Sequence, residues 1–283
     1  RLGPVGKDEA SDWGPGPVDA FGSARTFLFD EAHKPRHGVS YPHLWGMDQL
    51  SWFHYDGNTT SVLERNLGQA LGVGAVYDKE TYASILKPMN LHRLEVLARK
   101  ISPPIWPEQI LGKIDRDSAE RGGKLYTAHC AQCHPLVRAG EKAPDLLYDL
   151  KEIGTSPMRA DDFAANLPDG EPFVKAIEAA MTRIREKALE ELTPEQRRSF
   201  DSDPKAVWRA PDKYAGRPLA SAWATAPFLH NGSVPTLYDL LLPAKDRPKQ
   251  FHLGSHEFDP IKLGYITDPR PGTMVFDTTR EGN

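Results

Sequence analysis

The sequence predicts a mainly α-helical, loop-rich fold, on three observations. Apolar residues recur at helical spacing in several stretches, most clearly over residues 173–192. Helix-start signals accompany such stretches, as at Thr193-Pro194, where a capping residue precedes a proline in the first turn. The 25 prolines and 23 glycines are spread along all 283 residues, which indicates much irregular chain between the helices.

The first hundred residues are expected to form surface loop followed by three helical pieces. Residues 1–48 are rich in Gly, Pro, Asp and His, with a breaker cluster at 14–17, and should wrap the surface as ordered loop. A helix should start after a cap at Asn58, Thr59 or Thr60 and end at Gly72. A second piece should cover residues 79–86. A third should start from a cap at Asn90, with its apolar residues at Leu91, Leu94, Leu97, Ala98 and Ile101.

Residues 102–107, SPPIWP, form the clearest linker, because consecutive prolines cannot continue a helix. We therefore expect one domain over residues 1–107 and another over 108–283. In the second, a capping box at Asp117 to Glu120 should open a helix that leads to Cys130. Residues 243–283 should contain only short extended pieces and turns.

Cys130, Cys133 and His134 form the pattern CAQCH, which is typical of a c-type haem attachment site. Each thiol adds to one vinyl group of the haem, and the adjacent histidine becomes the proximal ligand of the iron. A zinc knuckle is the alternative, but it needs four ligands. These two cysteines are the only ones in the chain, so the sequence favours one covalently bound haem c.

Charge and hydropathy exclude several other classes. The net charge of −4 gives no electrostatic reason to expect nucleic acid or an anionic membrane as a partner. No apolar stretch is long enough to span a bilayer. The chain starts at Arg1 without a signal-like segment, so we expect a processed or truncated chain. Covalent haem attachment takes place outside the bacterial cytoplasmic membrane, which predicts a periplasmic or secreted protein.

Residues 223–242, WATAPFLHNGSVPTLYDLLL, resemble a segment of the bacterial dihaem cytochrome c peroxidases, and more closely the rubber oxygenase branch of that superfamily. Residues 54–66 and 247–260, the latter with GSHEFDP, are similar to the same branch. The resemblance implies a cytochrome c-type haem domain preceded by part of a second, peroxidase-like helical domain. It also implies a haem-dependent peroxidase or dioxygenase type of oxidoreductase.

The sequence departs from that family in three respects. It lacks the upstream haem motif, so a second haem is expected only from residues outside this chain. The tryptophan that relays electrons between the two haems of the peroxidases is replaced by Tyr55, so Tyr55 and the nearby Trp52 are candidate relays. The chain also stops near Asn283, about where the family's distal histidine segment would begin. A fragment, a cleaved chain or a subunit completed by another chain would each fit.

Several residues are candidates for the sixth iron ligand or for support of the haem. His230 and His256 are the main ones, as distal ligand or as a group behind it, although packing is favoured for His230 and a surface position for His256. The weaker candidates are His129, His252, Met158, Met181 and Met274, with a core position favoured for the methionines.

Two functions follow from these observations. The first is an oxidoreductase of the dihaem type in which the haem on His134 is the electron-carrying centre. The second is a simple monohaem electron-transfer cytochrome that is a subunit of a larger complex, and a haem-containing structural subunit is a third interpretation. Either function implies a redox partner protein or a second haem-bearing segment.

Overall fold

The computed structural model describes residues 17–32, 38–138 and 140–280 of the chain. The predicted breaker positions 14–16 and the chain end at residues 281–283 lie outside these residues. The helices are α1 (Ala20–Phe29), α2 (Val62–Gly72), α3 (Pro88–Ala98), α4 (Glu108–Leu111), α5 (Arg116–His129), α6 (Leu150–Ile153), α7 (Met158–Ala164), α8 (Phe173–Glu190), α9 (Pro194–Arg197) and α10 (Leu237–Leu240). The strands are β1 (Leu146–Asp149), β2 (Lys213–Gly216), β3 (Gln250–Leu253), β4 (Phe258–Asp259), β5 (Gly264–Tyr265) and β6 (Met274–Asp277).

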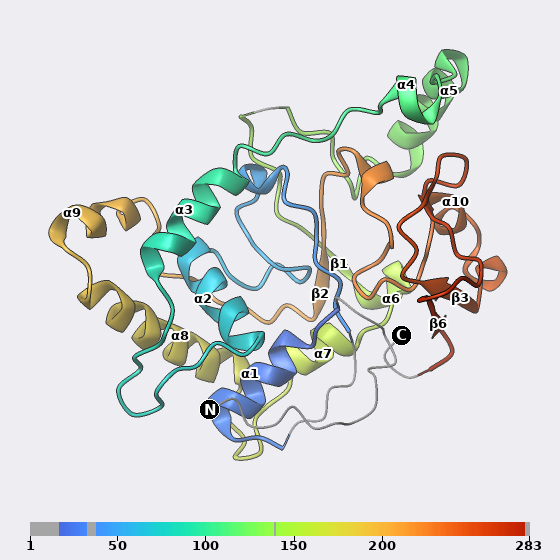
Figure 1. Ribbon diagram of the computed structural model, residues 1–283. Coiled ribbons are helices and arrows are strands. Elements are labelled where there is room, and N and C mark those ends of the chain that lie inside the picture. Colours follow the sequence, from blue (N-terminus) through green and yellow to red (C-terminus); the bar gives the residue numbers. More distant parts are fainter. Residues whose placement is uncertain (1–16, 33–37, 139, 281–283) are drawn as a thin grey trace.

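The hydrophobic core lies where α1, α2, α7 and α8 meet (Figure 1). The predicted face of α8 is confirmed: Phe173, Ile177, Met181 and Ile184 are all buried. Their spacing of three and four residues places them on one side of the helix. Aromatic rings surround Phe173: the ring centre of Phe163 lies 5.5 Å, and that of Phe29 5.8 Å, from the ring centre of Phe173.

Helix α1 corrects the prediction that residues 1–48 form loop. Asp19 caps it by accepting a hydrogen bond from the Gly22 amide at 2.9 Å, and Phe21 and Ala24 enter the core. Gly22 and Ser23 are weak helix formers, so propensity alone hides this helix. Packing against α2 and α7 stabilises it instead.

The predicted helix over residues 79–86 is also wrong. The carboxylate of Asp78 accepts hydrogen bonds from the amides of Glu80 and Thr81, at 2.9 and 2.7 Å, and this forms a turn. A bridge between Tyr77 and Ser84 then closes the loop. Tyr82 has a positive φ of 59°, which an α-helix does not contain, so the chain turns back after this single turn.

Helix boundaries differ slightly from the expected caps. Ser61 caps α2, one to three residues after the predicted positions, and α2 ends at Gly72 as predicted. Helix α3 starts at Pro88, so Asn90 lies inside it. Thr193 caps α9 as predicted, and the structure adds a capping box with Gln196.

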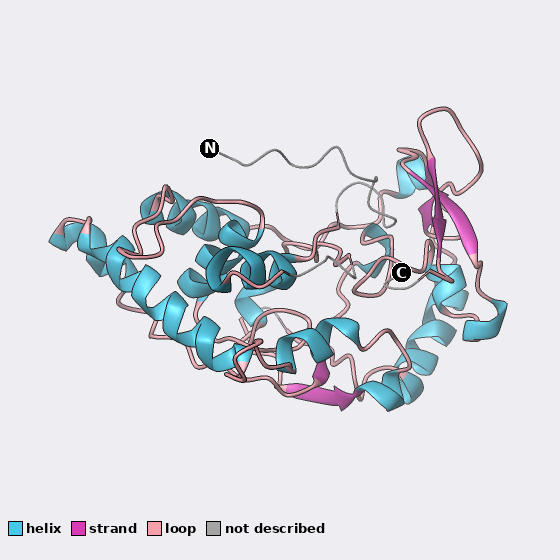
Figure 2. Ribbon diagram, turned by 90° about the horizontal axis from the view of Figure 1, so that it is seen from below, coloured by secondary structure: helices cyan, strands magenta, loops and turns pink. Residues whose placement is uncertain are grey.

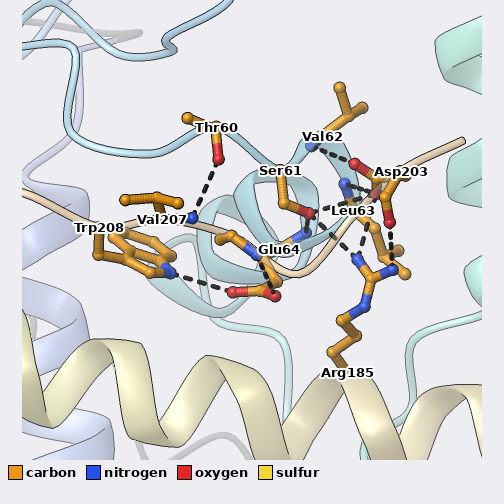
Figure 3. A network of polar contacts seen from close by, with 10 residues as sticks. Thr60, Ser61, Val62, Leu63, Glu64, Arg185, Asp203, Val207 and Trp208 are labelled. Atoms are coloured by element: carbon orange, nitrogen blue, oxygen red, sulfur yellow. Dashed lines mark hydrogen bonds and ion pairs between the residues drawn. The ribbon is translucent and has the colours of Figure 1, made fainter.

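A buried polar network joins the start of α2 to the chain after α8 (Figure 3). Asp203 accepts hydrogen bonds from the Val62 and Leu63 amides, which have no partner inside the helix. Glu64 is fully buried and accepts from the Trp208 indole at 3.0 Å and from the Ala206 amide at 3.1 Å. Because these bonds satisfy the carboxylate, its burial is tolerated.

The strands of the described residues form antiparallel pairs: β1 with β2, β3 with β6 and β4 with β5. Residues 243–280 contain short extended pieces and turns, as predicted. Figure 2 shows the C-terminal strands at the opposite end of the molecule from α8.

The predicted linker, residues 102–107, has no helix or strand. The core, however, combines residues from both sides of it, including Leu67 of α2 and Phe173 of α8. The two segments therefore pack together, and the division at residue 107 stays a prediction.

Candidate functional site

Helix α5 leads directly into the CAQCH motif, as the sequence predicts. The cap is Asp115, whose carboxylate accepts from the Ser118 amide at 3.0 Å, so the helix begins before the predicted box at Asp117. It ends at His129, and Cys130 follows as its C-cap residue. Figure 1 shows α4 and α5 at the periphery, away from α1, α2 and α8.

Two tyrosines and a glycine hold the motif in place. The Tyr126 hydroxyl donates to the His134 carbonyl at 2.5 Å, and the Tyr148 hydroxyl on β1 donates to the Gln132 carbonyl at 2.7 Å. On β2, Gly216 lies so close to the Cys133 carbonyl that a Cβ there would overlap it. The pair of strands β1 and β2 is therefore the support of the motif.

The imidazole of His134 is oriented by a main-chain carbonyl. Its Nδ1 lies 2.8 Å from the carbonyl oxygen of Arg217, the residue after β2. A carbonyl oxygen only accepts, so this contact assigns the proton to Nδ1 and leaves the Nε2 lone pair free. Metal-bound histidines in proteins are commonly held in this way.

The motif fits a covalently bound haem. Cys130 and Cys133 are both free thiols and half-buried. The interaction with Cys133 raises the pKa of Tyr148. In the described ranges, no group of three or more His, Cys, Asp or Glu side chains is placed to hold a metal ion. The zinc alternative thus has no ligand set there.

Tyr55 lies in a loop beside β2, the strand that precedes Arg217. Residues 53–59 form a tight loop in which the Phe53 amide donates to the Thr59 carbonyl at 2.8 Å. The Tyr55 carbonyl accepts from the Ala215 amide of β2 at 2.7 Å, two residues before Arg217. The structure therefore brings the candidate relay and the proximal ligand to one short segment of chain.

Three arginines give this loop a positive surrounding. Burial and the charge of Arg159 lower the pKa of His54 to about 3, with smaller contributions from Arg65 and Arg217. Burial also lowers the pKa of Arg217, to about 10. His54 is therefore neutral at pH 7, and its Nδ1 lies 2.6 Å from the Asn58 side-chain oxygen.

Trp52 and His230 lie near the same segment. The guanidinium of Arg209 stacks 3.6 Å above the Trp52 ring, and Trp52 lines a shallow hollow beside Gly216 and Arg217. His230 is buried, with its ring 4.8 Å from that of Tyr214 and 6.1 Å from that of Tyr55. Relay and support roles for these residues remain predictions.

The other candidates are spread over the molecule. His256 is exposed between β3 and β4, and His129 is exposed at the end of α5. His252 on β3 contacts the Thr273 hydroxyl at 2.9 Å. Of the methionines, Met181 is fully buried in the core. Met158 is half-buried at the start of α7, and Met274 is half-buried on β6.

Sequence reasoning missed Arg217, Tyr148 and Gly216. Arg217 lies 83 positions after His134, and Tyr148 lies 16 positions after Gln132, so neither belongs to a local pattern. Tyr126 had a weak signal, since it stands four residues before Cys130, about one helical turn.

Comparison with known proteins identifies one region of the chain. Residues 213–252 match the family described as RoxA-like, cytochrome c-like. The protein y4iJ of Sinorhizobium fredii is 34% identical over 290 residues, covering 87% of this chain and 49% of its own. The protein y4iM of the same organism is 30% identical over 245 residues, covering 84% of this chain and 52% of its own. The chain thus spans about half the length of these relatives.

None of the helices in the described ranges has the length and apolar character needed to cross a membrane. The matched residues include β2, Arg217 and His230. The segment that supports His134 therefore belongs to a RoxA-like, cytochrome c-like region, and such a region implies haem c with its iron.

Proposed function

We propose that this chain is a haem c oxidoreductase of the dihaem peroxidase or rubber oxygenase type, in which the haem on His134 carries electrons. The contact between Nδ1 of His134 and the Arg217 carbonyl, at 2.8 Å, supports this most directly. It joins the attachment motif to the region that matches a cytochrome c family. A periplasmic or extracellular location belongs to the same proposal, because c-type haem is attached there.

Each residue of the site has a task in this function. Bound haem iron supplies one-electron redox chemistry. Cys130 and Cys133 form the thioether bonds, and His134 coordinates through Nε2. The Arg217 carbonyl fixes the tautomer of His134 and makes its imidazole a stronger donor. Tyr126 and Tyr148 keep the motif in register with β1 and β2.

The test is an intact mass and an optical spectrum of the protein made in cells that attach c-type haem. We expect one covalent haem and a spectrum that changes on reduction. Replacement of both cysteines by alanine should abolish covalent attachment. His134→Ala should keep the thioethers but change the iron spectrum, while His129→Ala, an exposed histidine one residue before Cys130, should match the wild type. A wild type without covalent haem would refute the proposal.

Peroxide and copurification answer separate questions about this haem. A spectrum unmoved by peroxide indicates an iron with both axial positions filled, as expected of an electron-carrying haem in either function. A spectrum that peroxide shifts indicates an open position at this iron, which would then do more than carry electrons. Copurification with a second haem-bearing polypeptide would support the dihaem type, and the same titration should be repeated on that complex.

A further inference from the structure

Three arginines surround His54 and Tyr55, and two of them are neutralised. Arg65 forms an ion pair with Glu95 at 2.6 Å, and both side chains are buried. Arg159 pairs with the buried Asp56 at 3.2 Å. These pairs follow the usual rule that a cation taken out of water needs an anionic partner.

Arg217 is the one of these three arginines that has no ion-pair partner among the described residues. Its guanidinium donates to the His54 carbonyl and lies 5.9 Å from the centre of the Tyr55 ring. The Asp56 carboxylate also attracts this charge, but it is already paired with Arg159. A carbonyl and a neutral phenol do not compensate a full positive charge. In the part of the chain that the structure describes, no carboxylate lies within ion-pair distance of it.

The hollow beside Arg217 contains a carboxylate, that of Asp145, but it is already paired. Both of its oxygens are bound by Arg209, at 2.6 and 2.7 Å. An arginine fork that binds both oxygens leaves little attraction for a second cation. Arg217 therefore keeps its capacity to bind an anion.

The main chain places this cation beside the proximal ligand. The carbonyl of Arg217 holds Nδ1 of His134, so the guanidinium lies within one side-chain length of that ligand. A haem carries two propionate carboxylates, and guanidinium matches a carboxylate with two parallel hydrogen bonds. Resting on the proposed function, we propose that the Arg217 guanidinium binds a haem propionate, so that one residue holds the haem through both its main chain and its side chain.

The test compares Arg217→Gln with Arg217→Lys and with Arg209→Lys as a matched control, since Arg209 is paired with Asp145 and a lysine keeps that carboxylate paired. Resonance Raman spectroscopy of the haem-loaded protein reports the propionate bending mode. We expect both Arg217 variants to shift this mode, because neither offers the two parallel hydrogen bonds of the fork. Arg209→Lys should leave it at the wild-type frequency.

Redox titration gives the second measurement. In Arg217→Gln, loss of the cation should lower the equilibrium constant for reduction of the ferric haem about tenfold. This corresponds to a reduction potential about 59 mV lower for one electron. Arg217→Lys keeps the charge and should stay within about threefold of the wild type. A propionate mode unchanged in Arg217→Lys overturns the proposal, even if Arg217→Gln does not fold. A wild type without covalent haem refutes the proposed function instead, so the two failures are distinguishable.

Discussion

Helices α8 and α5 differ in what holds them. One face of α8 is buried against α2 and α7, whereas every residue of α5 is exposed except the half-buried Tyr126. An isolated helix of 14 residues is marginal in water. Helix α5 therefore depends on its Asp115 cap, on the tyrosine contacts and on what binds its motif. Burial against α2 and α7 stabilises α8, whereas a haem on His134 would give α5 its main apolar contact.

Phe173→Ala should have the largest effect on this comparison. Phe173 is fully buried among aromatic rings, so its truncation should lower the free energy of unfolding by about 3–5 kcal/mol. Leu125→Ala on α5, where the side chain is 61% exposed, should cost less than about 0.5 kcal/mol in the protein without haem. Urea unfolding followed by circular dichroism measures both. If the two variants lost similar amounts of unfolding free energy, the contrast between a buried α8 and an exposed α5 would be wrong.

The second prediction concerns pH. His54 has a pKa of about 3 in the folded chain and about 6.5 when unfolded, so the unfolded state takes up its proton first as pH falls. Stability from the neutral imidazole is complete above pH 6.5 and declines toward pH 3. The decline should be about 1.4 kcal/mol per pH unit.

His54→Asn is the matched variant, because asparagine tolerates the positive φ of 64° at this position. Its unfolding free energy should fall less steeply than that of the wild type between pH 6.5 and 4.5. Parallel curves for the two proteins would show that His54 takes up its proton in the folded state.

Gly216→Ala should disturb the haem motif. A Cβ at this position would overlap the Cys133 carbonyl and come within 2.8 Å of the Tyr148 ring, so strand β2 must shift. We expect a loss of roughly 1–3 kcal/mol and a lower yield of covalent haem. Mass spectrometry of the loaded fraction checks it, and an unchanged yield would mean that attachment does not need β2 in place.

Gly122→Ala should have the smallest effect and the opposite sign. A Cβ at this position meets nothing within 4 Å, so the substitution should stabilise α5 by about 1 kcal/mol in the protein without haem. Helix content by circular dichroism should rise slightly. If the same variant weakens the haem-loaded protein, then another backbone packs against Gly122 in that state.

Local patterns predicted what depends on local chemistry. The spacing of Phe173, Ile177, Met181 and Ile184 predicted both α8 and its buried face, and Thr193-Pro194 predicted the start of α9. The haem motif could be predicted because its ligand pattern lies within five consecutive residues. Contacts between distant segments could not be predicted in this way.

Helix α1 shows that limit for the fold, since its stability comes from contacts with α2 and α7 and not from its own residues. Arg217 shows it for the site. Its contact with His134 spans 83 positions, and a main-chain carbonyl has no side-chain signature. The helix predicted over residues 79–86 is absent for a different reason, because Tyr82 has a positive φ and Tyr77 pairs with Ser84.

The distance of Arg217 from His134 along the chain bears on how the protein matures. His134 leaves the ribosome long before residues 213–217, so no Arg217 carbonyl is present to orient its imidazole while those residues are still unmade. Both thiols are present once the motif has been made, whereas the orientation of the His134 ring needs the Arg217 carbonyl beside it. The spectrum of an iron bound by His134 would therefore change when β2 docks, and it would report the folding of this region.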